Sequence, residues 1–224
     1  SESSDTISEA CSQFEYETGG HSEKVLDSDL VIISPGVSDN LDIFKAVRSK
    51  NIPVISEIEF ASWFTSTTIL ALTGSNGKTT TTLLLDAMCK SGGLNSIPTG
   101  NLGIPFSDVV LEELRTGNTP DVYVMEVSSF QLEHIEHFSP HIGCIFNITP
   151  DHLDRYENFD SYRFAKLNLL KSLREPGWFV YNADDPCLSD YASDQNPSIT
   201  GIRSCFVWYF SGCSFHLKAR QFKG

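Results

Sequence analysis

Apolar residues in this chain alternate between short continuous runs and longer stretches with helical spacing. From residue 68 onward, the runs predict buried strands and the stretches between them predict helices. The predicted strands are 68–73, 95–98, 121–127, 142–148 and 177–182, and the predicted helices are 78–91, 106–115 and 160–174. This alternation predicts an α/β fold, with a mainly parallel sheet that is covered by helices on both faces.

The chain before residue 65 shows a shorter version of the same pattern. Residues 25–34 have the apolar density of a buried strand, residues 41–50 have helical spacing, and residues 52–55 form a short apolar run. Residues 57–64 are predicted to be a short helix or a linker. We interpret this part as the end of one βαβ unit, joined to the rest of the chain near residues 65–67.

Composition narrows the class of protein. The 224 residues are 40% hydrophobic and 20% charged, as in a globular protein, and the formal net charge of −13 argues against nucleic acid or an anionic membrane as partner. No apolar stretch reaches transmembrane length, and the first residues lack the basic and apolar regions of a signal peptide, so we expect no secretion. The six cysteines show no metal or disulfide spacing, which predicts free thiols in a reducing compartment.

A glycine-rich turn joins the strand predicted at 68–73 to the helix predicted at 78–91. In such a loop several backbone N–H groups surround a phosphate chain, Lys78 reaches the β/γ-phosphates, and the Thr79 hydroxyl is placed to ligate Mg²⁺. The strict P-loop spacing asks for glycine at position 72, where this chain has leucine, and an ordinary glycine turn is the alternative. The context of strand, loop and helix favours nucleotide binding. The candidate nucleotide-binding residues are Gly74, Ser75, Asn76, Gly77, Lys78, Thr79 and Thr80.

Two more candidate residues, Glu126 and His152, lie at or after the ends of later predicted strands. Glu126 ends the strand predicted at 121–127, so its carboxylate faces the same crevice as the glycine loop and could hold a cation that bridges the phosphates. The alternative is an ordinary strand-end glutamate. His152 follows the strand predicted at 142–148, between Asp151 and Asp154. It is either a metal ligand or phosphate-oriented group, or part of a capping and turn cluster, and the residues alone leave both open.

Five motifs in this chain occur in the order and spacing of the Mur ligases, which the chain therefore resembles. The motifs are residues 73–79, 99–105, 126–133, 147–155 and 164–167. The resemblance covers roughly residues 21–185, and the motif at 126–133 is most similar to the branch of the family that adds D-glutamate to UDP-N-acetylmuramoyl-L-alanine. It implies an ATP-dependent amide ligase of peptidoglycan synthesis, in which the γ-phosphate passes to the substrate carboxylate and D-glutamate attacks the resulting acyl phosphate.

The resemblance also implies roles for single residues. It implies that Lys78, His152 and Lys166 are catalytic, that Thr79 and Glu126 hold a first Mg²⁺, and that His152 helps to hold a second. Lys166 matches a family lysine that is carbamylated and so becomes an oxygen ligand of the second Mg²⁺; from the residues alone it would be a lysine on a solvated helix face. Asn101 and Ser128 match positions near the muramyl substrate, although Asn101 could merely support its turn.

The resemblance further implies how the chain is divided. Residues 1–64 would be the C-terminal part of a UDP-binding Rossmann-like domain, residues 65–185 an incomplete ATP-binding central domain, and residues 186–224 a tail that the pattern does not place. The C-terminal ligase domain is not found, so we expect these residues alone to be inactive as a ligase. The expected partners are UDP-N-acetylmuramoyl-L-alanine and D-glutamate. We expect a monomer in the cytoplasm, or in the plastid stroma of a plant or alga.

Three alternatives stay open at this point. The chain could be a non-catalytic remnant that still binds nucleotide, or another ligase of the Mur or folylpolyglutamate type. An unrelated P-loop NTPase is the third alternative, and the four motifs beyond the glycine loop argue against it.

Overall fold

The computed structural model describes residues 14–38, 40–152, 155–174, 177–182, 184–188, 202–211 and 214–221, and for the last two segments it describes the backbone alone. The chain separates into two compact units, residues 1–31 with 38–54 and residues 32–37 with 55–224. No helix in the described segments combines the length and the apolar character that crossing a membrane requires.

The first unit contains a short 3-10 helix, η1 (Glu23–Asp27), and the helix α2 (Asp42–Ser49). The single strand predicted at 25–34 is wrong over most of its length, since only β1 (Val31–Ile33) is extended; β1 pairs with β2 (Val54–Ser56). The local hydrogen bonds explain the difference. The Ser22 hydroxyl accepts from the N–H of Lys24, and the N–H of Ser28 donates to the carbonyl of Val25, so both ends of η1 are capped.

The second unit is built on a sheet with the strand order β4-β5-β3-β6-β7-β8-β9 in the described residues. Neighbouring strands are parallel, except that β9 runs antiparallel to β8. The pairing of β8 with β7 extends the sheet into the tail that the pattern did not place. The strands are β3 (Thr68–Thr73), β4 (Ser96–Gly100), β5 (Val122–Glu126), β6 (Ile142–Ile145), β7 (Gly177–Asn182), β8 (Ile202–Ser211) and β9 (Ser214–Gln221).

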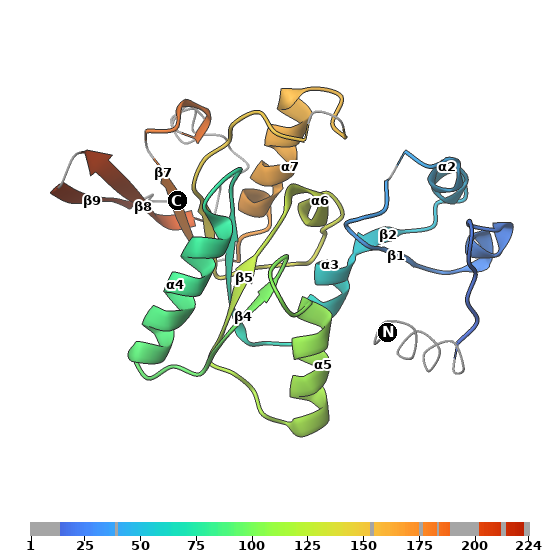
Figure 1. The fold of residues 1–224 in the computed structure, drawn as a ribbon, viewed down its shortest axis with the longest axis horizontal. Coiled ribbons are helices and arrows are strands. Elements are labelled where there is room, and N and C mark those ends of the chain that lie inside the picture. The colour runs from blue at the N-terminus through green and yellow to red at the C-terminus, as the bar shows by residue number, and fades with distance from the viewer. Residues whose placement is uncertain are drawn as a thin grey trace. The chain divides into compact units, whose positions relative to one another are not determined.

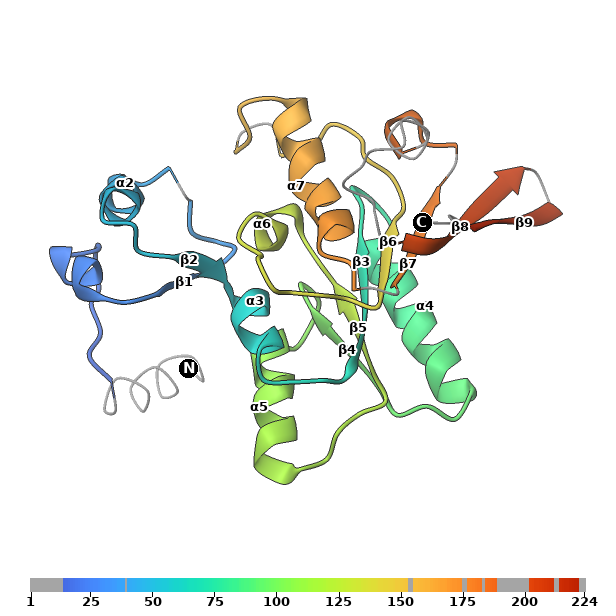
Figure 2. The ribbon, with the colours of Figure 1, turned by 180° about the vertical axis from the view of Figure 1, so that it is seen from behind.

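Helices cover both faces of this sheet, as the alternating pattern predicts. They are α3 (Glu57–Ser62), α4 (Lys78–Ser91), α5 (Phe106–Thr116), α6 (Ser129–Leu132) and α7 (Phe159–Lys171). Ile69 and Met125 belong to one buried cluster, together with residues of α3, α5, α6 and α7. Leu72 and Val124 point to the other face, where Leu85 of α4 packs. Figures 1 and 2 show α4 on the side of the sheet opposite α3 and α5. The predicted α/β fold is confirmed.

The parallel register brings three loops to one edge of the sheet. Glu126, at the end of β5, lies opposite Leu72 of β3 and Gly100 of β4. The loop that follows β3, the turn that follows β4 and the end of β5 are therefore neighbours. Binding sites in such sheets lie beyond the carboxyl ends of the strands, and the candidate residues gather there.

A buried carboxylate ties α3 to the segment after α6. Glu59 is wholly buried, and its two carboxylate oxygens accept from the backbone N–H groups of Glu136, His137 and Phe138 at 2.7–2.9 Å. The indole N–H of Trp63 donates to the same group at 2.7 Å. Burial alone would raise the pKa of Glu59, but these four donors together hold it below its usual value.

Candidate functional site

The glycine loop leaves the first turn of α4 open to an anion. Gly77 is the N-cap of α4 and has a φ of 82°, a left-handed conformation that favours glycine. As glycine it has no side chain that could accept from the N–H groups of the first turn. These N–H groups and the positive end of the helix dipole form the kind of site that binds phosphate.

Two other N–H groups of the loop are already bonded within the protein. The N–H of Ser75 donates to the carbonyl of Asn147 at 3.0 Å, and the N–H of Asn76 donates to the Asn147 side chain at 2.9 Å. The Asn147 amide returns a hydrogen bond to the carbonyl of Asn76 at 3.2 Å. In this structure Ser75 and Asn76 therefore hold the loop against the segment after β6, whereas the N–H groups at the start of α4 have no capping side chain.

The Ser75 side chain fixes the loop from a second direction. Its hydroxyl donates to the carbonyl of Thr149 at 2.9 Å and lies 3.0 Å from the hydroxyl of Tyr162 on α7. Asp185, in the segment after β7, supports the same residues, because its carboxylate accepts from the N–H of Ile148 at 2.8 Å. The loop is thus held by α7 and by the segment after β6.

Two lysines converge on the loop. Lys78 Nζ donates to the carbonyls of Gly74 at 2.9 Å and Ser75 at 3.2 Å, and Lys166 Nζ donates to the same Gly74 carbonyl at 3.0 Å. Lys166 is 2% exposed, and its Nζ lies 4.7 Å from the centre of the Tyr162 ring. Burial, and then the charge of Lys78, lower the pKa of Lys166 to about 7. A considerable share of Lys166 is therefore a neutral amine at neutral pH.

Glu126 binds groups from both neighbouring loops. Its carboxylate accepts from the Thr79 hydroxyl at 2.7 Å and from the Asn101 side-chain amide at 2.9 Å, and it is 3% exposed. The Asn101 N–H also donates to the Glu126 carbonyl at 2.8 Å. A Cβ at Gly100 would overlap that carbonyl, so glycine is required for this close approach. Asn101 thus supports its turn, and it also contacts the candidate metal ligand.

The Thr79 and Glu126 pair fits Mg²⁺. Both groups offer oxygen, and Mg²⁺ in phosphate sites is commonly held by one or two carboxylates together with the substrate phosphates. Among the described residues no three or more His, Cys, Asp and Glu side chains gather into a metal cluster. A site of this kind does not require such a cluster, because a hydroxyl and the nucleotide complete it.

His152 lies on the side of the site formed by α6 and α7. Its ring centre is 5.2 Å from that of Phe130 and 6.1 Å from that of Tyr162, and its side chain is 48% exposed. Its φ of 52° and the bonds from the N–H groups of Arg155 and Tyr156 to its carbonyl also give it a turn role. The two interpretations of His152 are compatible, and its metal role stays a prediction.

Ser128 has a local function that the sequence analysis missed. It is the N-cap of α6, and with Gln131 it forms a capping box in which each side chain bonds the other's backbone N–H. The sequence Ser-x-x-Gln at residues 128–131 is the pattern that marks such a capping box. The expected position of Ser128 near the substrate stays a prediction. Tyr162, Asn147 and Asp185 were also missed as supports of the loop, because no local pattern marks them.

The cysteines with described side chains are not in disulfide bonds. Cys89, Cys144 and Cys187 form no disulfide, and burial raises the pKa of Cys144. Cys11 and Cys213 lie outside the described residues, and the side chain of Cys205 is not described.

Two family models match segments of this chain. Residues 72–204 match the model of the Mur ligase middle domain, and residues 7–43 match that of the MurD N-terminal domain. The middle-domain match runs past residue 185, into the tail that the sequence pattern did not place.

Curated relatives and a solved structure agree with these matches. The chain is 43% identical over 187 residues to UDP-N-acetylmuramoylalanine--D-glutamate ligase of Christiangramia forsetii, covering 83% of this chain and 41% of the relative. It is 44% identical over 195 residues to the enzyme of the same name from Salinibacter ruber, covering 84% and 41%. The chain thus spans about two-fifths of the length of these relatives. The structure of UDP-N-acetylmuramate:L-alanyl-gamma-D-glutamyl-meso-diaminopimelate ligase from Neisseria meningitides aligns with a TM-score of 0.53 at 17% identity, covering 89% of this chain and 66% of that one, which shows a shared fold.

Proposed function

Because the chain belongs to the Mur ligase family, we propose that it forms the ATP-binding part of a ligase that adds D-glutamate to UDP-N-acetylmuramoyl-L-alanine. The names of the relatives at 43% and 44% identity support this choice of substrates. One structural observation carries the proposal. Lys78, Lys166 and the hydrogen-bonded pair of Thr79 and Glu126 all gather at the glycine loop, at the carboxyl edge of the sheet.

On this proposal the loop holds the phosphate chain of ATP. The free N–H groups at the start of α4 bind phosphate oxygens, with Gly77 allowing the turn. Lys78 leaves the carbonyls of Gly74 and Ser75 and donates to the β/γ-phosphates, where its charge stabilises the transferred group. The short distance from Nζ to the loop supports this movement, since only the flexible end of the side chain has to turn.

Two magnesium ions are part of the proposal. Thr79 and Glu126 would hold the first, and His152 and carbamylated Lys166 would contribute to the second. Mg²⁺, when bound, supplies positive charge that offsets the charge of the phosphates. Asn101 would orient the carboxylate of Glu126 through the hydrogen bond at 2.9 Å. We keep Ser128 as a residue near the muramyl substrate, next to the capped start of α6.

Carbamylation of Lys166 has a chemical basis in this environment. The neutral amine attacks CO₂, a C–N bond forms, and one proton is released to give a carbamate anion. The lowered pKa of Lys166 raises the share of the reactive neutral amine, and the product replaces a buried cation near Lys78 with an anion. Burial to 2% exposure protects the carbamate from water.

The residues would then serve amide formation in two steps. The carboxylate of UDP-N-acetylmuramoyl-L-alanine takes the γ-phosphate and releases ADP, and the amine of D-glutamate attacks the acyl phosphate and expels phosphate. The protein supplies positioning and neutralisation of charge, and no covalent bond to the protein is required.

The division of the chain is also a proposal. We assign residues 1–64 to a UDP-binding domain and residues from 65 to a middle domain, and the family matches at 7–43 and 72–204 support this division. On this proposal the middle domain continues from residue 185 to at least residue 204. The protein would act as a monomer in the cytoplasm, or in the plastid stroma of a plant or alga.

Calorimetric titration with Mg-ADP tests the nucleotide site. The parent chain should bind, and Lys78→Ala should weaken binding by about tenfold or more, since a charge-assisted contact to phosphate is lost. Lys90→Ala is the matched control, because Lys90 lies at the far end of α4 and pairs with Asp86. Equal affinity in the parent and Lys78→Ala would remove the assignment of the loop.

A further inference from the structure

Arg155 makes an unusual set of contacts that the proposed chemistry does not use. Its guanidinium donates to the carbonyl of Pro35 at 2.7 Å and to the carbonyl of Val37 at 2.7 Å. The turn that carries these carbonyls is closed by a hydrogen bond from the N–H of Val37 to the carbonyl of Ser34 at 2.9 Å. Residues 32–37 and Arg155 belong to the same compact unit.

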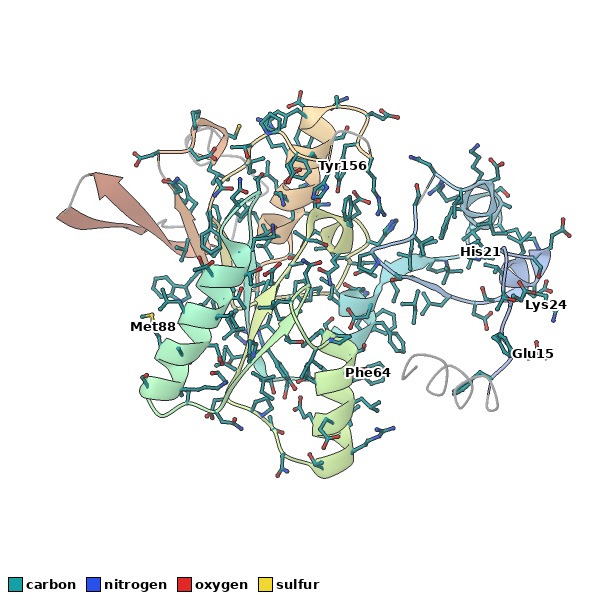
Figure 3. All side chains as sticks on the ribbon, viewed as in Figure 1. Glu15, His21, Lys24, Phe64, Met88 and Tyr156 are labelled. Carbon is teal, nitrogen blue, oxygen red and sulfur yellow. The ribbon has the colours of Figure 1, made fainter. Side chains whose placement is uncertain are left out.

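The backbone of Arg155 is hydrogen-bonded to the segment that carries His152. Its backbone N–H donates to the carbonyl of His152 at 3.0 Å. Its guanidinium carbon lies 3.9 Å from the centre of the Phe130 ring on α6, and that ring stacks on Tyr156, with ring centres 5.6 Å apart and planes at 7°. Figure 3 places Tyr156 beside α7. Arg155 therefore connects the turn to both α6 and the His152 segment.

We propose that Arg155 is a positioning residue, which locks the turn at residues 34–37 to the His152 segment so that the UDP-linked substrate is held in register with the glycine loop. The turn lies within the MurD N-terminal match, whereas Arg155 lies within the Mur ligase middle-domain match. The inference rests on the proposed function, in which the N-terminal part holds the UDP end of that substrate.

The chemistry of the contact requires arginine. A planar guanidinium can donate to two carbonyls along its edge while its face lies on an aromatic ring. A lysine at this position keeps the charge but lacks the fixed fork of donors, so it cannot make both hydrogen bonds and the ring contact together. A substrate that reaches from the turn to the phosphate loop needs a fixed spacing, because a small misplacement of the reacting group lowers the rate greatly.

The test compares Arg155→Lys and Arg155→Ala with the parent chain. Arg163→Lys is the matched control, because Arg163 also lies near an aromatic ring, that of Phe164 at 5.2 Å, while its guanidinium pairs with Asp160 at 3.2 Å. Hydrogen exchange followed by mass spectrometry should show the amides of Val37 and Arg155 exchanging about tenfold faster in both Arg155 variants, since charge-assisted hydrogen bonds are lost. Calorimetry should show UDP-N-acetylmuramoyl-L-alanine binding weakened about tenfold, with Mg-ADP affinity unchanged.

The outcomes separate this inference from the proposed function. Unchanged affinity for the UDP-linked substrate, or no binding of it in any of the proteins, overturns the positioning role. Loss of affinity for both ligands also overturns it, because that result reports general damage. If the parent fails to bind Mg-ADP while the Arg155 variants still lose the UDP-linked substrate, the nucleotide site is wrong and the positioning role stands. If Arg155→Ala does not fold by circular dichroism, Arg155→Lys decides.

Discussion

Lys78 and Lys166 donate to one carbonyl oxygen, that of Gly74, at 2.9 and 3.0 Å. Because both ammonium groups lie at one acceptor, the positive charge of Lys78 raises the free-energy cost of protonating Lys166, which is the more buried of the two. This shared contact explains why the charge of Lys78 adds to burial in lowering the pKa of Lys166. Phosphate binding would draw Lys78 away from the Gly74 carbonyl. Modification of Lys166 would change the second donor to the same carbonyl.

Lys166 should react with CO₂ in a pH-dependent way. Because its pKa is about 7, the share of neutral amine rises as the pH rises through that value, so carbamate should increase from about pH 6 to about pH 8 at constant dissolved CO₂. Carbon NMR with isotope-labelled CO₂ measures it. The signal should vanish in Lys166→Met and persist in Lys171→Met, which changes an exposed lysine of the same helix. Equal labelling in the parent and Lys166→Met would contradict the assignment.

Thr79 should be needed for the contribution of Mg²⁺ to nucleotide binding. Thr79→Val keeps the shape of the side chain and removes the hydroxyl that contacts Glu126 at 2.7 Å. The gain in ADP affinity on adding Mg²⁺ should therefore fall by about tenfold or more, while affinity without Mg²⁺ should stay the same. Thr79→Ser retains the hydroxyl and is the control. A full Mg²⁺-dependent gain in Thr79→Val would rule out Thr79 as a ligand.

Glu59 should stabilise the fold in a pH-dependent way. Its pKa is held below the unfolded value, so its contribution to the free energy of unfolding is present above the unfolded pKa of about 4.3 and is lost as the pH falls through the folded pKa. Glu59→Gln places an amide NH₂ opposite two of the N–H donors. It should lower the free energy of unfolding by about 2–4 kcal/mol at neutral pH.

Urea unfolding of the parent and Glu59→Gln at several pH values provides the measurement for Glu59. The difference between the two proteins should shrink as the pH falls below the unfolded pKa of about 4.3 and toward the lowered folded pKa of Glu59. Glu136→Gln is a suitable control, since Glu136 donates to Glu59 through its backbone N–H, which the substitution retains. A difference that stays constant down to acid pH would show that the carboxylate charge is not what holds residues 136–138.

Where local signals agreed, the sequence was sufficient to predict the fold. The bounds of β3, α4 and β7 match the predictions at 68–73, 78–91 and 177–182, because dense apolar runs and the glycine loop mark those ends clearly. The segment 25–34 was misread because its apolar residues do not reveal that serines cap η1. The four-residue helix α6 escaped notice for a different reason, since it is too short to show periodicity.

The meeting of Thr79 and Glu126 was predicted from the sequence, whereas the contacts that support the loop were not. Lys78, Thr79 and Glu126 follow from a loop and a strand end that meet at the same sheet edge. The bonds from Ser75 to Tyr162 and from Asn76 to Asn147 join residues separated by 87 and 71 positions. No local pattern contains such contacts, so the role of Tyr162 and the shared carbonyl of Gly74 required the structure.

The most direct test of the central claim is a D-glutamate-dependent reaction carried by these residues. Residues 72–188 of this chain would replace the corresponding segment of the Salinibacter ruber relative, which is 44% identical over the aligned part. The chimera, once shown to bind Mg-ADP, should release phosphate only when ATP, UDP-N-acetylmuramoyl-L-alanine and D-glutamate are all present, at about 1 s⁻¹ or faster, and Lys78→Ala in the chimera should abolish the release. A folded, nucleotide-binding chimera that releases no phosphate in response to D-glutamate would contradict the proposed function.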